Sequence, residues 1–196
     1  APPAGLLRPR QVHGVRVAQV CAPGRLDAEE ADAALSAEPG AGVGIVTADC
    51  VPILLATSSG RAVAAIHAGW RGLAAGVVDR GLAALAACAG SGDRLLAVIG
   101  PRIGPCCYEV DSPVTGALRE RFGKGVDQAG YPSRPGHVFL DLGRLVAEAL
   151  ARGGVAPEDL AAIDDACTAC DPARFHSYRR DGDSAGRLLH YIVPKG

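Results

Sequence analysis

Two short apolar runs joined by a turn are the feature of this sequence that most restricts its fold. The runs, Val51 to Ala56 and Ala62 to Ile66, flank a Ser-Ser-Gly turn, a pattern typical of two buried strands in a hairpin. Cys50 stands directly before the first run and His67 directly after the second. Because an antiparallel pair joined by a short turn brings its open ends together, we expect Cys50 and His67 to be neighbours.

The segment that follows His67 has the features of an anion-binding turn. It reads Ala-Gly-Trp-Arg-Gly and continues into an alanine-rich amphipathic stretch, which predicts a helix over Leu73 to Cys88. A strand, a glycine-bearing turn and the start of a helix together form a site where backbone N–H groups face an anion. Arg71 lies within this turn, so the sequence predicts a phosphate or carboxylate site there.

The rest of the chain alternates between strand patterns and helix patterns. Apolar runs predict strands, and capped amphipathic segments predict helices from Ser112 to about Phe122 and from Asp141 to about Arg152. Pro23 to Pro39 is polar and alanine-rich and is expected to cross the surface with some helix. Gly123 to Gly136 is rich in glycine and proline and is expected to be the most mobile loop. We therefore predict one layered α/β sandwich with mixed β-sheets over residues 1–196.

Composition excludes several classes of protein. The chain has 196 residues, 48% of them hydrophobic, with a formal net charge of −1, which suits a folded domain and does not favour nucleic acid or anionic membrane as a partner. No apolar run reaches the ~18 residues of a membrane-spanning helix, and the first residues have no signal-peptide core. Seven cysteines without an export signal favour free thiols or metal ligands, so we expect a cytoplasmic protein; the sequence indicates no oligomeric state.

A metal centre made of His13, Cys50 and His67 is one interpretation of the reactive side chains. One thiolate and two imidazoles suit zinc, and three protein ligands leave a fourth position for water or substrate. Two alternatives remain open at this point. Cys50 and His67 can be a buried thiol and a core histidine, or they can be the nucleophile and base of a metal-free cysteine hydrolase with Asp49 nearby.

Arginines and aromatic residues near the C-terminus are candidates for substrate binding. Arg179 and Arg180 lie in an aromatic-flanked turn, and together with Arg71 they suit bidentate capture of phosphate. Tyr178 and Phe175 can form a wall for a planar ring. Surface ion pairing is the alternative for any one of these arginines.

A second group of cysteines consists of Cys106 and Cys107 with the pair Cys167 and Cys170, which are separated by two residues. The spaced pair can be a redox couple or half of a zinc site. Because adjacent cysteines are awkward ligands for one tetrahedral ion, we expect inert thiols here.

Five segments in order, QVHG, TADCVPILL, HAGWRG, IGPCCYEV and SYRRDGDSAGR, resemble the laccase-domain family, also called YfiH-like or polyphenol oxidase family proteins. The match extends from Gln11 to the C-terminus. The resemblance implies an α/β fold with mixed sheets, related to a group of cysteine hydrolases. It also implies that His13, Cys50 and His67 bind a metal. Members usually begin with a further N-terminal segment, so the resemblance implies a single domain that lacks it.

The resemblance further implies an enzyme that acts on small molecules. Members are described as zinc-dependent purine nucleoside phosphorylases that cleave adenosine, inosine, guanosine or methylthioadenosine with phosphate and also deaminate adenosine. Older descriptions name copper-dependent polyphenol oxidases, and some bacterial members are linked to editing of peptidoglycan precursors. We expect the zinc nucleoside enzyme, with Arg71 and Arg179 or Arg180 on phosphate and Asp49 orienting a metal-bound histidine. Copper is the alternative ion, and the cysteine hydrolase is the metal-free alternative.

Overall fold

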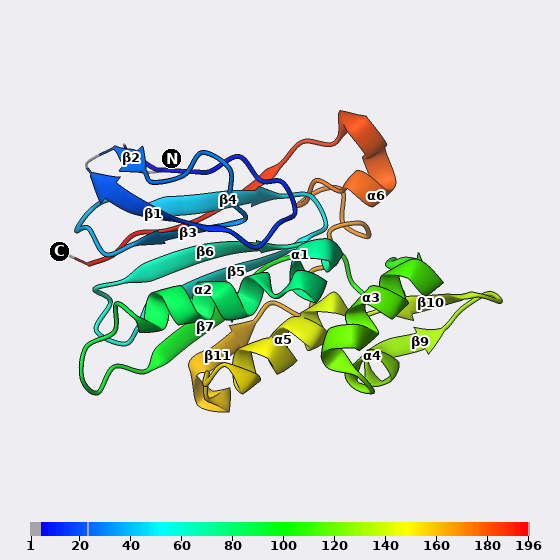
Figure 1. Ribbon diagram of the computed structural model, residues 1–196. Coiled ribbons are helices and arrows are strands. Elements are labelled where there is room, and N and C mark those ends of the chain that lie inside the picture. Colours follow the sequence, from blue (N-terminus) through cyan, green and yellow to red (C-terminus); the bar gives the residue numbers. More distant parts are fainter. Residues whose placement is uncertain (1–4, 23, 196) are drawn as a thin grey trace.

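A seven-stranded mixed sheet forms the centre of the molecule (Figure 1). The computed structural model describes residues 5–22 and 24–195. In sheet order the strands are β11 (Leu160–Ala162), β7 (Leu95–Ile99), β5 (Val51–Thr57), β6 (Val63–Ala68), β3 (Ala33–Ser36), β1 (Val17–Ala22) and β2 (Arg25–Leu26). The pairs β11–β7 and β1–β3 are parallel, and the other neighbours are antiparallel. The predicted α/β fold with a mixed sheet is therefore confirmed.

Strands β5 and β6 form the predicted hairpin in the middle of this sheet. Val51 pairs with Ala68 and Pro52 pairs with His67, so Cys50 comes one residue before the paired segment at the end where His67 lies. Both strands are almost entirely buried, because each lies between two neighbouring strands and under side chains on both faces. This explains their continuous apolar sequence.

Helices cover one face of the sheet. They are α1 (Trp70–Ala75), α2 (Val77–Ala86) and α5 (Leu142–Arg152), which pack on the sheet through residues such as Leu73, Leu82 and Leu145. The single helix predicted over Leu73 to Cys88 is instead two helices separated at Gly76, whose φ of 95° is left-handed. Asp141 caps α5 as predicted, because its side chain accepts a hydrogen bond from the backbone N–H of Arg144.

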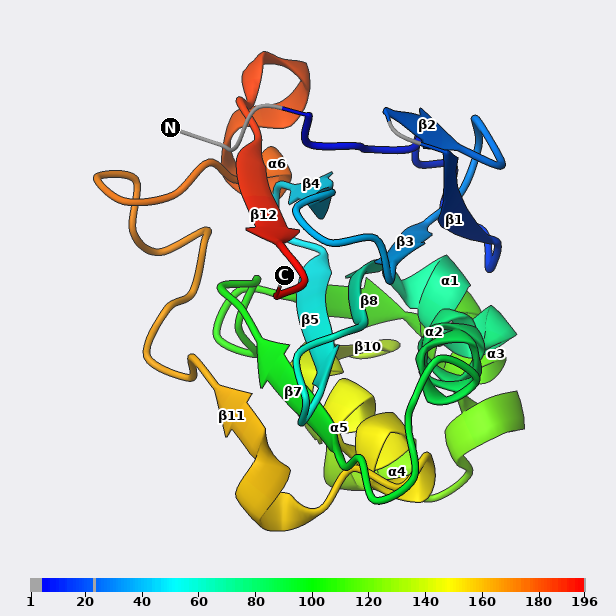
Figure 2. The same cartoon turned by 90° about the vertical axis from the view of Figure 1, so that its left-hand side faces the viewer.

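A two-stranded ribbon covers the opposite face (Figure 2). It consists of β4 (Val43–Thr47) and β12 (Leu188–Ile192), which pair antiparallel. Ile45 and Val43 from the ribbon pack against Val63 and Ala65 of β6 in a second, smaller core. Because β4 leads directly into Asp49 and Cys50, this packing also fixes where the open end of the hairpin begins.

A third sheet extends from the helical side. It contains β8 (Glu109–Asp111), β10 (His137–Leu140) and β9 (Gly130–Pro132) beside α3 (Ser112–Phe122) and α4 (Gly125–Gln128). The segment Gly123 to Gly136, expected to be a mobile loop, therefore carries a short helix and a strand instead. Val126, which is 2% exposed, anchors this segment to the main hydrophobic core. The remaining elements are α6 (Tyr178–Asp181) and the 3-10 turns η1 (Pro157–Asp159) and η2 (Gly182–Ser184).

The expectation for Pro23 to Pro39 is also wrong. This segment contains β2 and β3, and all four residues of β3 are buried. Small side chains such as Ala33 and Ala34 fit between β1 and β6 and give none of the apolar alternation that marks a half-exposed strand. Asp32, which precedes β3, is fully buried as well.

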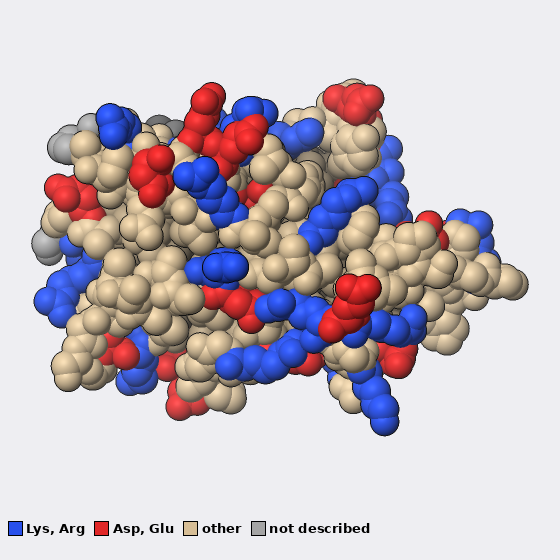
Figure 3. Space-filling view, viewed as in Figure 1, with Lys and Arg blue, Asp and Glu red and all other residues tan. Residues whose placement is uncertain are grey.

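The surface matches the near-neutral composition. Basic and acidic side chains are interspersed over the helical face (Figure 3). Within the described ranges, no helix is both long enough and apolar enough to cross a membrane.

Candidate metal centre

His13, Cys50 and His67 meet at the open end of the hairpin. One potential ligand atom from each of the three lies within 4.8 Å of the other two. The two imidazole rings are edge to face, with centroids 4.8 Å apart, and the Cys50 sulfur lies 3.9 Å from His13 Nε2. The structure therefore places the distant His13 beside the pair whose proximity the hairpin predicts.

Gly69 lets the backbone pass close to these side chains. A Cβ atom at this position would lie 2.8 Å from His13 Cδ2 and 3.1 Å from the Cys50 sulfur. Both distances are shorter than ordinary contacts. The glycine of the HAGWRG segment is thus required for the three side chains to converge, in addition to any role in the turn.

Asp32 holds the centre together, and our sequence analysis missed it. Its carboxylate accepts hydrogen bonds from the backbone N–H groups of Val12, His13 and Gly14 at 3.2, 2.9 and 2.6 Å. It also accepts one from His67 Nδ1 at 2.8 Å. His13 has a left-handed φ of 59°, and the bonds to Asp32 fix this turn. Because Nδ1 of His67 is bound to Asp32, its Nε2 is the nitrogen available to a metal.

The same contacts set the charges of the centre. Burial disfavours the charged form of Cys50, but hydrogen bonds and charges from His13 and His67 outweigh it and lower the thiol pKa to about 7. Burial likewise opposes the charge on His67, yet Asp32 and Cys50 raise its pKa to about 9. The pKa of Asp32 is lowered, since its bonds to His67 and to the backbone outweigh its burial. Without a metal, His67 is therefore an imidazolium near pH 7, and the Cys50 thiol beside it is about half ionised.

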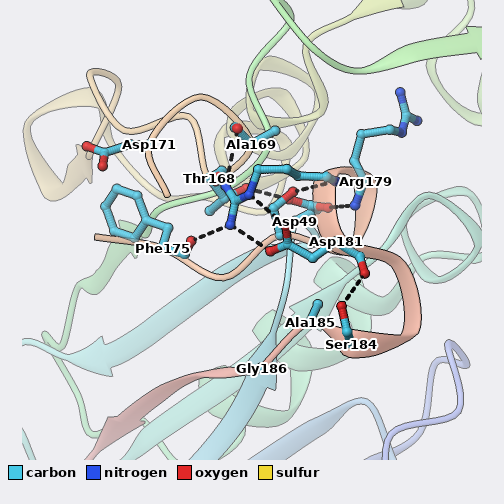
Figure 4. Close-up of polar contacts among 12 residues, drawn as sticks. Asp49, Thr168, Ala169, Asp171, Phe175, Arg179, Asp181, Ser184, Ala185 and Gly186 are labelled. Atoms are coloured by element: carbon cyan, nitrogen blue, oxygen red, sulfur yellow. Dashed lines mark hydrogen bonds and ion pairs between the residues drawn. The ribbon is translucent and has the colours of Figure 1, made fainter. Parts of the chain in front are cut away.

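Asp49 has a different task from the one we expected. Its carboxylate accepts hydrogen bonds from the Thr168 hydroxyl and from the backbone N–H of Arg179, both at 2.6 Å (Figure 4). Asp32, not Asp49, orients His67. Asp49 adopts a left-handed φ of 88°, so these two bonds tie the turn before Cys50 to the loop that carries α6.

A cleft of about 1030 Å³ opens over the three residues. Trp70 and Arg71 line it from the start of α1, and the Arg71 guanidinium lies 4.3 Å above the Trp70 ring centroid. Within the described part of the chain, no acceptor is within hydrogen-bonding distance of that guanidinium. Tyr108 lines the cleft too; burial first and then the charge of Cys50 raise its pKa, so its hydroxyl stays protonated. Nothing in the sequence singled out Tyr108 except its place in IGPCCYEV.

The two C-terminal arginines differ in their surroundings. Arg179 lines the cleft, and its guanidinium donates to the carbonyl oxygens of Cys107 at 2.8 Å and Glu109 at 3.2 Å. The Arg180 guanidinium instead binds the Asp181 carboxylate and the carbonyl oxygens of Thr168, Ala169 and Phe175. It does not line the cleft and holds its own loop in shape. Tyr178 lines the cleft, with its side chain largely exposed.

Comparisons with known proteins place the chain in a family. A family model described as multi-copper polyphenol oxidoreductase laccase matches residues 1–195. The chain belongs to this laccase family. It is 42% identical over 176 residues to a purine nucleoside phosphorylase of Xylella fastidiosa, covering 88% of this chain and 66% of that protein. The chain thus spans about two thirds of that relative's length.

Two further relatives of this laccase-family chain are informative. It is 32% identical over 198 residues to an adenosine deaminase of an unknown prokaryotic organism, covering 97% of this chain and 75% of that protein. The crystal structure of a hypothetical protein, YfiH, of Bacillus licheniformis superposes with a TM-score of 0.88 at 28% identity. The superposition covers 97% of this chain and 74% of that chain. The fold expected from the resemblance is therefore confirmed.

The donor set of this laccase-family chain fits a divalent metal. One low-pKa thiol and two imidazoles, one of them oriented by a buried carboxylate, form the usual surroundings of zinc or copper. Three protein donors would leave a fourth position of a tetrahedral ion for water or substrate, as in a catalytic centre rather than a structural one. The cluster and the family thus both fit a metal cofactor.

Proposed function

We propose that this chain is a zinc-dependent purine nucleoside phosphorylase that also deaminates adenosine. The observation that carries the proposal is the convergence of His13, Cys50 and His67 on a cleft of about 1030 Å³. A cleft of this size accommodates a nucleoside together with a phosphate ion. The names of the relatives, purine nucleoside phosphorylase and adenosine deaminase, support the same reactions.

Phosphate binding is assigned to Arg71 and Arg179, which both line the cleft. The described residues leave the guanidinium donors of Arg71 unused, and the guanidinium lies over the Trp70 ring. An arginine placed in this way is suited to capture of a phosphate. Arg179 keeps part of its guanidinium for a ligand, because two carbonyl oxygens occupy only two of its five donors. Arg180 is left out of this phosphate site, and Tyr178 is retained as an exposed wall of the cleft.

The reactions use these groups in distinct ways. In phosphorolysis, a phosphate oxygen bonds to ribose C1′ while the C1′–N9 bond breaks, and the purine leaves with the bonding electrons and takes up a proton. The arginines hold the attacking anion close to C1′, which removes most of the entropy of the encounter. In deamination, water adds at C6 of adenine and ammonia leaves. A divalent ion held by His13, Cys50 and His67 would supply a Lewis acid for this reaction.

Zinc is preferred over a set of copper ions because of the donors available. A multicopper cluster needs many imidazoles, and this chain has five histidines in all. Among the described residues only His13 and His67 belong to a group of potential metal ligands. One ion per cleft is what this set can hold, and a thiolate with two imidazoles satisfies zinc.

The test is an assay of the zinc-loaded protein with adenosine. With phosphate present we expect release of adenine and ribose 1-phosphate, and without phosphate we expect conversion to inosine. Cys88→Ser, which changes an exposed cysteine outside the cleft, is the matched control for Cys50→Ser. Zinc-loaded protein that yields neither adenine nor inosine contradicts the proposal. Activity that survives complete chelation but is lost in Cys50→Ser would assign the cysteine hydrolase instead, for which the thiolate–imidazolium pair is suited.

A further inference from the structure

Four cysteines form a second cluster, separate from the cleft centre formed by His13, Cys50 and His67. Cys106 and Cys107 lie in the loop after β7, and Cys167 and Cys170 lie in the loop after β11. One sulfur from each lies within 4.8 Å of the other three. About sixty residues separate the two pairs in sequence, and the parallel pairing of β7 with β11 brings their loops together.

The spacing of the sulfur atoms distinguishes a metal site from a disulfide. The Cys170 sulfur lies 3.3 Å from that of Cys107 and 3.5 Å from that of Cys106. Four thiolates around a tetrahedral zinc, at about 2.3 Å from the ion, have sulfurs about 3.8 Å apart, whereas a disulfide requires about 2.05 Å. The cluster is thus close to the arrangement of a tetrathiolate centre, and Cys170 is equally near to two partners rather than paired with one.

The adjacency of Cys106 and Cys107 argued against a metal in the sequence, and the structure removes this objection. Residues 105–107 form a turn, and this turn brings both sulfurs within 3.5 Å of Cys170. The backbone N–H of Gly104 also points at the Cys167 sulfur, at 3.2 Å. A backbone donor directed at sulfur stabilises the thiolate form that a metal needs.

We propose that Cys106, Cys107, Cys167 and Cys170 bind one structural zinc ion. Four protein ligands complete the tetrahedral shell, so this site is closed and provides no position for substrate. Soft thiolate ligands in a tetrahedral set select zinc over magnesium, calcium or manganese. The ion lies near the surface, since Cys106 and Cys170 are exposed.

The zinc site clamps two loops that support the cleft. Thr168, next to Cys167, binds the Asp49 carboxylate through its hydroxyl and the carbonyl oxygen of Arg102 through its N–H. The carbonyl oxygen of Cys107 accepts a hydrogen bond from Arg179. One ion at the cluster therefore fixes both the acceptor of Arg179 and the partner of Asp49, without touching a ligand in the cleft.

The test measures zinc in protein purified under reducing conditions, with Cys50→Ser as background so that the cleft centre does not contribute. We expect one zinc per chain in Cys50→Ser and none in Cys50→Ser/Cys170→Ser, while Cys50→Ser/Cys88→Ser keeps one. X-ray absorption at the zinc edge, measured on Cys50→Ser itself, tests the ligand set without a further substitution. It should show four sulfur neighbours at about 2.3 Å.

Two results would overturn the proposal. The first is folded, zinc-supplemented Cys50→Ser protein that holds no zinc and has all its remaining cysteines open to alkylation. The second is a chain in which Cys107 or Cys106 is joined to Cys170 in a disulfide, detected as two alkylation sites missing by mass. Neither result depends on whether the cleft is active. The proposed zinc site of the four cysteines and the proposed nucleoside reactions are therefore tested separately.

Discussion

The cleft centre and the four-cysteine cluster place similar ligand atoms in opposite surroundings. The cleft centre has one thiol and two imidazoles at the open end of a buried hairpin, facing a cleft. The four-cysteine cluster has thiols alone, in two loops at the surface. The number of donors decides what each can do, because three leave a position for chemistry and four leave none.

The two sites also differ in the groups that orient their ligand side chains. Asp32, which is fully buried, orients His67 and fixes the turn of His13. The four-cysteine cluster is supported by backbone N–H groups directed at Cys167, and among the described residues it has no comparable carboxylate. An incomplete ligand set needs orientation from outside, whereas a complete set of thiolates is oriented by the ion itself.

The largest effect should come from removing the thiol of the cleft centre. Cys50→Ser should abolish phosphorolysis and deamination, a loss well beyond the roughly 100-fold that follows removal of an outer partner of a metal ligand. It should also lower bound zinc by one ion per chain and leave the four-cysteine cluster loaded. Metal analysis and adenosine turnover, measured on one preparation, check both parts. Full activity in Cys50→Ser would break the division of tasks between the sites.

Asp32→Asn should have the next largest effect. In the zinc-free protein, the substitution removes the charge that holds the buried His67 imidazolium, and breaking such a pair costs about 3 kcal/mol of unfolding free energy. Zinc affinity at the cleft should fall about 10- to 100-fold, with no change at the four-cysteine cluster. Competition with a zinc chelator and denaturant unfolding provide the two measurements.

Asp93→Asn is the matched control for Asp32→Asn. Asp93 also accepts hydrogen bonds from backbone N–H groups, those of Ser59 and Gly90, but lies outside the cleft. It should leave the zinc affinity of the cleft unchanged. An equal loss of zinc in the two variants would mean that Asp32 acts only on general stability.

A histidine in the ribbon should make the stability of the fold depend on acid. His190 of β12 binds the Thr47 hydroxyl at 2.9 Å, and Thr47 precedes Cys50 by three residues. Burial lowers the pKa of His190 from 6.5 to about 4. His190 therefore takes up a proton below pH 6.5 in the unfolded chain but only near pH 4 in the folded chain. The free energy of unfolding should fall as the pH is lowered across this window.

The measurement is the unfolding free energy between pH 7 and pH 4. His190→Asn should remove on the order of 2 kcal/mol of the loss in this window, after a discount for partial exposure. His176→Asn, which removes an exposed imidazole, should retain the full slope. An unchanged slope in His190→Asn would show that another group causes the loss of stability in acid.

Local signals made part of this structure predictable. The short turn between β5 and β6 determines the register that brings Cys50 beside His67, and Asp141 with its following apolar pattern marks α5. These features depend on residues close in sequence. The division of the long helix at Gly76 was missed because an alanine-rich segment tolerates a glycine by pattern alone. The break depends on the backbone, since Gly76 has a φ of 95°, a conformation that other residues rarely adopt.

The orienting groups could not be derived from sequence because they act across long separations. Asp32 lies in a polar segment that looks exposed, and only pairing of β3 with β6 carries it under His67. The four cysteines meet because β11 pairs with β7, a contact that no local pattern specifies. The same distance in sequence hid Thr168 and Arg179 as partners of Asp49.

The smallest effect is the one that separates positioning from chemistry. Cys170→Ser should open the four-cysteine cluster and loosen the turn at 105–107, whose Cys107 carbonyl holds Arg179 at 2.8 Å. A displaced guanidinium weakens phosphate binding more than it alters the reacting atoms, so KM for phosphate should rise roughly 3- to 10-fold with kcat within about 2-fold. Cys88→Ser should change neither value. A fall in kcat with unchanged KM would instead assign the four-cysteine cluster to the reaction itself, and the contrast between a closed positioning site and an open reactive one would be lost.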